Sequence, residues 1–178
     1  MNLTGGQFKG IKIDIPNNAR PTLSKVRQGV FNILSNFEFE NNTFLDMFSG
    51  SGLMSLEALS RGYDSYCIEL NSKNAEIIKK NYKKINKIPN LTIKNALQFK
   101  SDEKFEIIYL DPPWNFDYAP IIKKSLELLD KNGIIIVEYD SEEKINLEKI
   151  INDLNLDLEI IKSKKYGRCL IDILTPKA

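Results

Sequence analysis

Residues 105–114 read FEIIYLDPPW, and this stretch is the clearest indication of a strand with candidate functional residues at its carboxyl end. Its apolar part is rich in β-branched and aromatic side chains and is cut off by proline, which predicts a short buried strand over residues 105–110. Asp111 stands where that strand ends. Pro112 and Pro113 then remove two backbone donors and fix two φ angles, so the chain is expected to leave the sheet along a rigid path.

The end of this strand combines groups that suit a flat base with an exocyclic amine. The Asp111 carboxylate and the proline carbonyls are acceptors for the amine hydrogens, and Trp114 offers a face on which a ring can stack. An ordinary strand exit with a surface tryptophan explains the same residues about as well when the motif is taken alone. The rest of the chain has to decide between the two interpretations.

The bulk composition is that of one soluble domain, residues 1–178. The chain has 42% hydrophobic residues and a net charge of +1, so any nucleic-acid contact must come from local patches. No apolar run is long enough to span a bilayer and no signal peptide is evident, so we expect a cytoplasmic protein. Histidine is absent and the only cysteines are Cys67 and Cys169, so we expect free thiols and no metal site.

The front of the chain, residues 1–40, is expected to form a small β-hairpin or extended arm followed by a helix. Residues 3–15 contain glycines and an alternating IKIDI segment. After the RPT triplet at 20–22, apolar side chains recur with helical spacing. Arg27 falls near the first turn of this helix, where a cation is unfavourable for the helix dipole. An anionic partner explains that placement, and a solvated arginine explains it equally well.

From residue 41 onward, predicted strands and helices alternate. Strands are expected at 43–47, 65–70, 91–94, 105–110 and 134–139, helices at 53–60, around 75–85, at 121–129 and at 141–154, and a final hairpin at 156–162 and 169–174. This order predicts an α/β fold with a doubly wound, mainly parallel sheet, to which the hairpin adds antiparallel strands.

In such a sheet the ligand lies at the carboxyl ends of the strands, where the strand order reverses. The candidates at that edge are Asp46 with the FSGSG turn of residues 48–52, then Glu69, Asn95 and Asp111. Glycines in the turn allow close approach of the backbone, and Glu69 is placed to hold two ribose hydroxyls. Asp46 would repel a pyrophosphate but attract a cationic amino group, which favours S-adenosylmethionine over a dinucleotide.

Two motifs together resemble the class I S-adenosylmethionine-dependent methyltransferases, which have a Rossmann-like fold. They are FLDMFSGSGLMSLEALSRG at 44–62 and IIYLDPPW at 107–114. The front end, GGQFKGIKI at 5–13 followed by RPTLSKVRQGVFNIL at 20–34, is similar to the RsmD family of bacterial 16S rRNA guanine-N2 methyltransferases. The resemblance covers nearly the whole chain. It departs from the family pattern at Trp114, where phenylalanine or tyrosine is more usual, and at Asn95, where an acidic residue is common.

The resemblance implies S-adenosylmethionine as cofactor, no metal, and methylation of a guanine N2 amine of 16S rRNA by a monomer, within the small subunit or its assembly intermediate. Because tryptophan occurs at this place in some adenine-N6 enzymes, adenine-N6 methylation of DNA or RNA is the alternative. The implied residues are catalytic Asp111, Pro112, Pro113 and Trp114; cofactor-binding Asp46, Phe48, Gly50, Ser51, Gly52, Glu69, Leu70, Asn95, Ala96 and Asp111; and substrate-binding Arg20, Thr22, Arg27 and Trp114.

Overall fold

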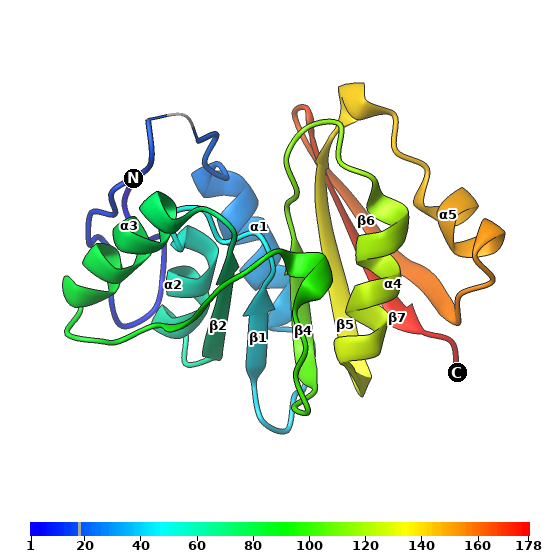
Figure 1. The fold of residues 1–178 in the computed structure, drawn as a ribbon, viewed down its shortest axis with the longest axis horizontal. Coiled ribbons are helices and arrows are strands. Elements are labelled where there is room, and N and C mark those ends of the chain that lie inside the picture. The colour runs from blue at the N-terminus through cyan, green and yellow to red at the C-terminus, as the bar shows by residue number, and fades with distance from the viewer. Residues whose placement is uncertain (18) are drawn as a thin grey trace.

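A seven-stranded sheet with the order β3-β2-β1-β4-β5-β7-β6 forms the centre of the computed structural model, which describes residues 1–17 and 19–178 (Figure 1). The strands are β1 Thr43–Asp46, β2 Asp64–Glu69, β3 Asn90–Ile93, β4 Phe105–Leu110, β5 Leu129–Asp140, β6 Leu158–Tyr166 and β7 Cys169–Pro176. Strands β1 to β5 are parallel, and β7 is antiparallel to both of its neighbours. The expected α/β class with a C-terminal antiparallel hairpin is confirmed.

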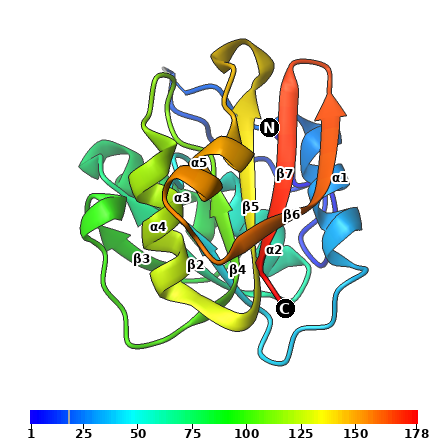
Figure 2. The ribbon, with the colours of Figure 1, turned by 90° about the vertical axis from the view of Figure 1, so that its right-hand side faces the viewer.

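The helices are α1 Ser24–Leu34, α2 Leu53–Ser60, α3 Ser72–Lys83, α4 Tyr118–Leu128 and α5 Leu147–Asp153, with 3-10 turns at Ala96–Gln98 and Ser141–Glu143. The single helix expected over residues 141–154 is wrong. A capping box between Asp140 and Glu143 starts a short 3-10 turn. The turn ends at Lys144, whose backbone is left-handed with a φ of 53°, and α5 begins as a separate helix after it. Figure 2 shows the C-terminal hairpin with α1 beside β6.

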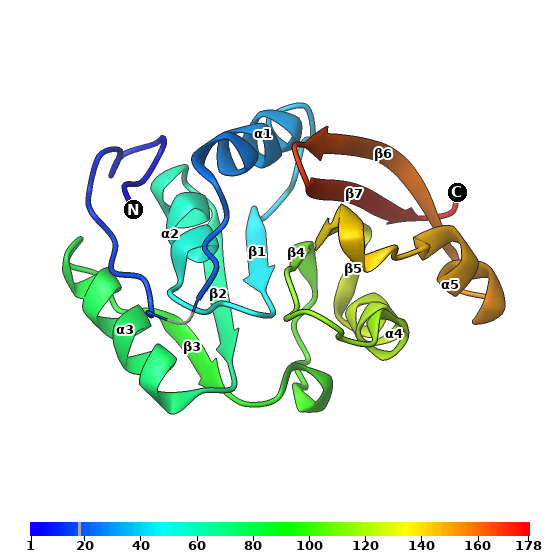
Figure 3. The same ribbon diagram turned by 90° about the horizontal axis from the view of Figure 1, so that it is seen from above.

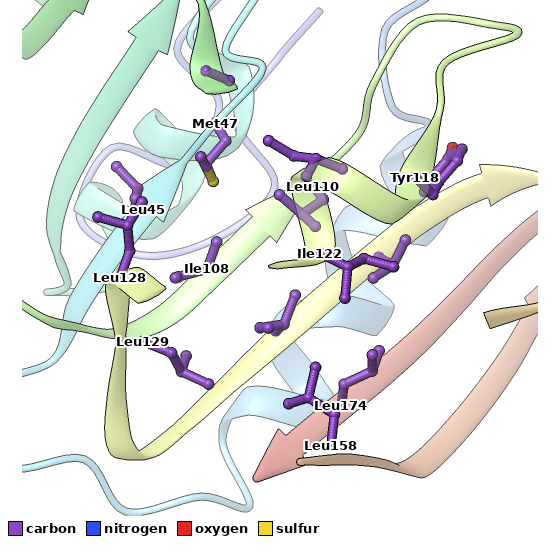
Figure 4. Close-up of a cluster of buried hydrophobic side chains, with 14 of the residues drawn as sticks. Leu45, Met47, Ile108, Leu110, Tyr118, Ile122, Leu128, Leu129, Leu158 and Leu174 are labelled. Atoms are coloured by element: carbon purple, nitrogen blue, oxygen red, sulfur yellow. The ribbon is translucent and has the colours of Figure 1, made fainter. Parts of the chain in front are cut away.

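Helices lie on both sides of the sheet (Figure 3), and alternating side chains along the strands divide the apolar core between its two faces. On one face, Leu45, Ile108 and Val137 pack with α4 and α5, and Figure 4 shows the centre of this cluster. On the other face, Phe44 and Tyr109 pack with α1 and α2, and α3 continues this layer over β2. Because the alternation continues past the end of a strand, it also determines on which side of the sheet the side chain that follows the strand lies.

Of the two forms expected for the front segment, a small β-hairpin or an extended arm, the structure shows an arm that closes on itself without regular strands. The amide of Leu3 donates to the Ile11 carbonyl at 3.0 Å, and that of Ile13 donates to the Met1 carbonyl at 2.6 Å. The segment's only β pairing, within the described residues, is an isolated antiparallel bridge between Asn2 and Lys12. The amide of Gln7 also donates to the Ser60 carbonyl at 2.6 Å, at the end of α2. Gly6 takes a φ of 75° there, and a Cβ on it would lie 1.9 Å from that carbonyl oxygen, so only glycine allows the contact. The segment is therefore an arm docked on α2.

Arg27 is not a substrate residue, which corrects the expectation from its position in α1. Its side chain is fully buried and its Nη1 donates to Glu57 Oε1 at 2.7 Å and to the Asn2 carbonyl at 3.0 Å. Glu57 is also fully buried and accepts hydrogen bonds from Arg61 and from the amide of Thr4. The anionic partner that the helix position implied is therefore an internal carboxylate.

Both cysteines are free, as expected, with Cys67 buried and Cys169 half-buried. Among the described residues, no helix combines the length and the apolar character that crossing a bilayer requires.

The Glu57 network predicts an asymmetric response to mutation. Glu57→Gln leaves the Arg27 guanidinium buried without its counter-charge, so we expect a loss of about 3–5 kcal/mol in the free energy of unfolding. Arg27→Met leaves Glu57 still paired with Arg61 and Thr4, so we expect a clearly smaller loss. Urea denaturation measures both.

Glu76→Gln is the matched control, because it removes the partner of Lys79 in an exposed i,i+3 pair on α3. We expect it to change stability by less than about 1 kcal/mol. Equal losses for Glu57→Gln and Arg27→Met would contradict this account of the network.

Candidate active site

A cavity of about 1310 Å³ opens at the carboxyl ends of the parallel strands, over the point between β1 and β4 where the strand order reverses. The expected site residues that line it are Arg20, Thr22, Asp46, Phe48, Gly50, Ser51, Glu69, Leu70, Asn95, Ala96, Asp111, Pro112, Pro113 and Trp114. Arg27 and Gly52 are not part of the lining. Gly52 stands behind the turn as the N-cap of α2, with a φ of 77°.

Four carboxylates reach the cavity from four neighbouring strands. Asp46 ends β1, Glu69 ends β2, Asp111 follows β4 and Glu138 lies near the end of β5. Side chains two residues apart along a strand point to the same face of the sheet. Each of the four carboxylates lies two residues beyond a strand residue that packs against the layer of α1, α2 and α3, so all four are on that face. Negative charge therefore gathers on one wall of the cavity.

The glycine turn is tied to β2 through Glu69. The amide of Gly50 donates to Glu69 Oε2 at 2.7 Å, and the amide of Asn71 donates to Oε1 at 2.8 Å. Gly50 has a φ of 55°, and a Cβ on it would meet no protein atom within 4 Å. The Glu69 carboxylate is thereby fixed beside open space, with lone pairs left to accept from a ligand.

Asp46 is buried, and its Oδ1 accepts from the amide of Phe48 at 3.2 Å. No lysine or arginine of the described chain forms an ion pair with it. Burial, with a further contribution from the Glu69 carboxylate, raises the pKa of Asp46 to about 7. The protein thus holds a desolvated acid here that a cation would stabilise in its charged form.

The DPPW segment lies against the glycine turn. The amide of Phe116 donates to the Pro113 carbonyl at 3.2 Å, and the Phe116 ring meets Phe48 edge-on with centroids 5.2 Å apart. Trp114 stands at the rim with 48% of its surface exposed. Burial, and then the carboxylates of Glu138 and Asp46, hold the pKa of Asp111 well above its usual range.

Glu138 is a cavity residue that our sequence reasoning missed. It accepts hydrogen bonds from the Tyr109 hydroxyl, from Thr22 Oγ1 at 3.3 Å and from Cys169 Sγ at 3.3 Å, and burial raises its pKa. It therefore ties β4, β7 and the segment before α1 together beneath Asp111. Its signal was available, since it is an acidic residue near the carboxyl end of a predicted strand.

The open side of the cavity carries an ion-pair network that includes Arg168, another residue the sequence reasoning missed. Asp140 Oδ2 lies 3.0 Å from Arg20 Nη1 and 3.1 Å from Arg168 Nη2. A hydrogen bond from the Glu142 amide, followed by the two arginines, lowers the pKa of Asp140. Arg20 is 63% exposed at its side chain, and its guanidinium is already paired. Arg168, in the two-residue turn of the hairpin, had no pattern to mark it.

Comparison with known proteins places this geometry in a family. A family model described as "Conserved hypothetical protein 95" matches residues 1–175. "Ribosomal RNA small subunit methyltransferase D" of Buchnera aphidicola from Baizongia pistaciae is 35% identical over 168 residues, which are 87% of this chain and 82% of that protein. The chain belongs to the RsmD family. "Putative rRNA methyltransferase YlbH" of Bacillus subtilis is 30% identical and covers 86% of this chain and 89% of its own.

Solved structures titled as putative methyltransferases or methylases share the whole fold. "Putative methyltransferase yhhF" from Escherichia coli superposes with a TM-score of 0.83 at 24% identity, covering 100% of this chain and 98% of its own. A putative methylase from Haemophilus influenzae gives a TM-score of 0.74 at 23% identity, with 99% and 98% covered. The fold is the Rossmann-like fold of the methyltransferases, as the sequence resemblance implied.

The raised pKa of Asp46 predicts a pH dependence of stability. The unfolded chain loses this proton near pH 4, whereas the folded protein keeps it up to about pH 7, so the free energy of unfolding falls as the pH rises between these values. Asp46 contributes on the order of 4 kcal/mol at most to that fall. In Asp46→Asn we expect a smaller fall between pH 4.5 and about 7.5, measured by urea denaturation at each pH.

Asp140→Asn is the control of opposite sign. The pKa of Asp140 is lowered, so its contribution is present above its unfolded pKa and is lost only as the pH drops through the folded value. That variant should leave the slope between pH 4.5 and 7.5 unchanged. An unchanged slope in Asp46→Asn would show that Asp46 is already ionised in the folded protein.

Proposed function

We propose that this chain transfers a methyl group from S-adenosylmethionine to the exocyclic N2 amine of a guanine in 16S rRNA of the small ribosomal subunit. The observation that carries the proposal is the placement of the Asp111–Trp114 segment and the Asp46–Glu69 pair in one cavity at the strand switch point. Membership of a family whose curated relatives are named for methylation of small-subunit rRNA supports the substrate class.

The residues present fit S-adenosylmethionine. Its sulfonium and amino group are cationic, and the cavity offers the buried, unpaired Asp46 carboxylate on its wall. Glu69, fixed by two backbone amides, is placed to accept from ribose hydroxyls, and Gly50 leaves the backbone open to close approach. The cavity of about 1310 Å³ exceeds the roughly 300–1,000 Å³ of common ligand sites, so a cofactor and a target base fit together.

When bound, this cofactor supplies a methyl group on a sulfonium, so the leaving group comes with it. The task of the protein is then to hold the amine. Asp111 and the Pro112 carbonyl are the acceptors that orient the two amine hydrogens, and the rigid Pro-Pro turn keeps them in place. Since the Asp111 carboxylate is desolvated beside Glu138 and Asp46, positive charge in the cavity stabilises its ionised, accepting form.

The base must leave its stack to reach Asp111, and Trp114 at the rim is the surface on which it can stack. We further propose that the chain acts as a monomer, on the subunit or its assembly intermediate, in the cytoplasm where subunits assemble. Residues 1–178 then act as one methyltransferase domain, with 1–40 on the substrate side and 41–178 holding the cofactor.

Trp114 supports a second candidate, adenine-N6 methylation of DNA or RNA, because tryptophan after DPP is found in some enzymes of that class. Nucleoside mass spectrometry separates the two. Protein incubated with small subunits, protein-free 16S rRNA and DNA should form N2-methylguanosine in the ribosomal substrates. N6-methyladenosine as the product would overturn the guanine assignment.

Asp111→Ala is expected to reduce methyl transfer by about 10²–10³-fold, the usual effect of removing one group that positions the reacting atom. Cofactor affinity, measured by calorimetric titration, should change little, because Asp46 and Glu69 remain. The matched control is Asp117→Ala, which removes a carboxylate from the same loop that only caps α4. It should lower stability by about 1 kcal/mol and leave turnover intact. An active Asp111→Ala enzyme would refute the assigned role.

Trp114→Ala is expected to weaken RNA binding by about 1–3 kcal/mol through the lost stacking surface, which is roughly a 5- to 150-fold rise in the RNA concentration needed for half-maximal single-turnover rate. Trp114→Phe keeps an aromatic face and should behave close to wild type. If Trp114→Ala is also unchanged, the residue packs at the rim and does not stack on the base.

A further inference from the structure

A second hollow, of about 410 Å³, lies between α1 and β6, which stand side by side in Figures 2 and 3. We call it the α1–β6 groove. Its polar lining consists of Lys25, Gln28 and Asn32 on α1, Asn36 just after α1, and Lys162, Lys164 and Tyr166 on β6. Aspartate and glutamate are absent from the lining given by the described residues. The groove is therefore a strip of cations and amides on a chain whose net charge is only +1.

The periods of the two elements produce this strip. Lys25, Gln28, Asn32 and Asn36 recur at helical spacing, so they form one stripe along α1 and its following turn. Lys162 and Lys164 alternate with Ile161 and Ser163 along β6, so the two side chains leave the same face of the strand from Cα atoms about 6.6 Å apart. Their neighbours on β7, Ile173 and Ile171, are buried in the cluster that includes α1, which places the lysines at the open edge of that layer.

The groove and the cavity meet at two residues. Lys25 and Tyr166 line both. Tyr166 packs so close to α1 that a Cβ on Gly29 would lie 2.1 Å from its hydroxyl oxygen, so glycine at this position lets the ring lie between helix and hairpin. A strand whose base enters the cavity can therefore continue past Tyr166 into the groove.

We propose that the α1–β6 groove binds the sugar-phosphate backbone of the RNA strand that flanks the methylated nucleotide. This rests on the proposed function, and it adds a docking direction and the residues that provide it. Lysines supply charge for phosphates, whereas the amides of Gln28, Asn32 and Asn36 can donate to phosphate oxygens or accept from ribose hydroxyls. Lysines that recur regularly along β6 match the regular spacing of phosphates in an extended single strand of RNA better than lysines scattered over a surface do.

The competing surface is a row of lysines on α3 and at its end, Lys79, Lys80, Lys83 and Lys84, and the structure favours the groove over it. Lys79 and Lys84 are paired with Glu76 and Asp14 at 2.7 and 2.8 Å. Neither residue lines the groove or the cavity. Lys80 and Lys83 form no ion pair within the described chain, but they too lie outside the linings of both the groove and the cavity. Lys25, Lys162 and Lys164 are also without an ion pair there, and all three line the groove. Their charges are free to release counterions when RNA binds.

The test compares Lys25→Gln/Lys162→Gln/Lys164→Gln with Lys79→Gln/Lys80→Gln/Lys83→Gln, which removes the same charge from α3. Filter binding to small subunits and to protein-free 16S rRNA at several salt concentrations gives the slope of log affinity against log salt. Each lost phosphate contact should lower the slope by about 0.7, so the groove variant should lose about 2 and the α3 variant almost nothing. With limiting RNA, the groove variant should have a raised KM and an unchanged kcat.

Three results would contradict the proposal that the α1–β6 groove binds the RNA backbone. They are an unchanged slope in the groove variant, an equal loss in the α3 variant, or a loss seen with subunits but not with protein-free rRNA, which would indicate a ribosomal protein as the partner. None of them depends on methylation. Failure of the proposed function is recognised separately, because the wild-type protein would then bind RNA with the expected salt slope but form no methylated nucleoside.

Discussion

A buried ion pair between Arg27 of α1 and Glu57 of α2 holds the front of the chain on the sheet. Glu57 also accepts the amide of Thr4, so one carboxylate joins the N-terminal arm and two helices in the core. The position of α1 determines two surfaces at once. Its buried side covers β4 and β5 beside the cavity, and its polar stripe forms one wall of the α1–β6 groove. Any shift of this helix would displace both.

The cavity brings together carboxylates that form no ion pair with any lysine or arginine of the described chain, and the charge of Arg20 offsets their repulsion only in part. Asp46, Asp111 and Glu138 are desolvated close to one another, and the pKa of each is raised. Such an arrangement lowers the stability of the protein without a ligand, because buried carboxylates near one another resist ionisation. It is favourable for a site that receives a cationic ligand, since the ligand then relieves the repulsion. The protein without ligand is therefore less stable because of the same carboxylates that favour binding of a cationic ligand.

The sequence predicted those parts of the fold whose causes are local. β4 has the expected bounds because a run of apolar residues ends at two prolines, and α2 has them because Gly52 and Gly62 flank it. Arg27 was misjudged because its partner, Glu57, is 30 residues away in the chain and is brought close only by packing. The choice between a hairpin and an arm in residues 3–15 stayed open for the same reason, since the contact of Gln7 with the end of α2 links residues far apart in the chain. Glu138 could have been found with the strand-end rule that selected Asp46 and Asp111.

The separation of charge between cavity and groove determines what can enter each. A phosphate is repelled by the carboxylates of Asp46, Asp111 and Glu138, whereas a neutral base with an amine is accepted by them. The lysines of the α1–β6 groove attract the phosphates that the cavity rejects. On this proposal, the RNA backbone is drawn along the groove and only the base crosses Tyr166 into the cavity. A protein with almost no net charge can therefore distinguish backbone from base, because its positive and negative surfaces lie side by side.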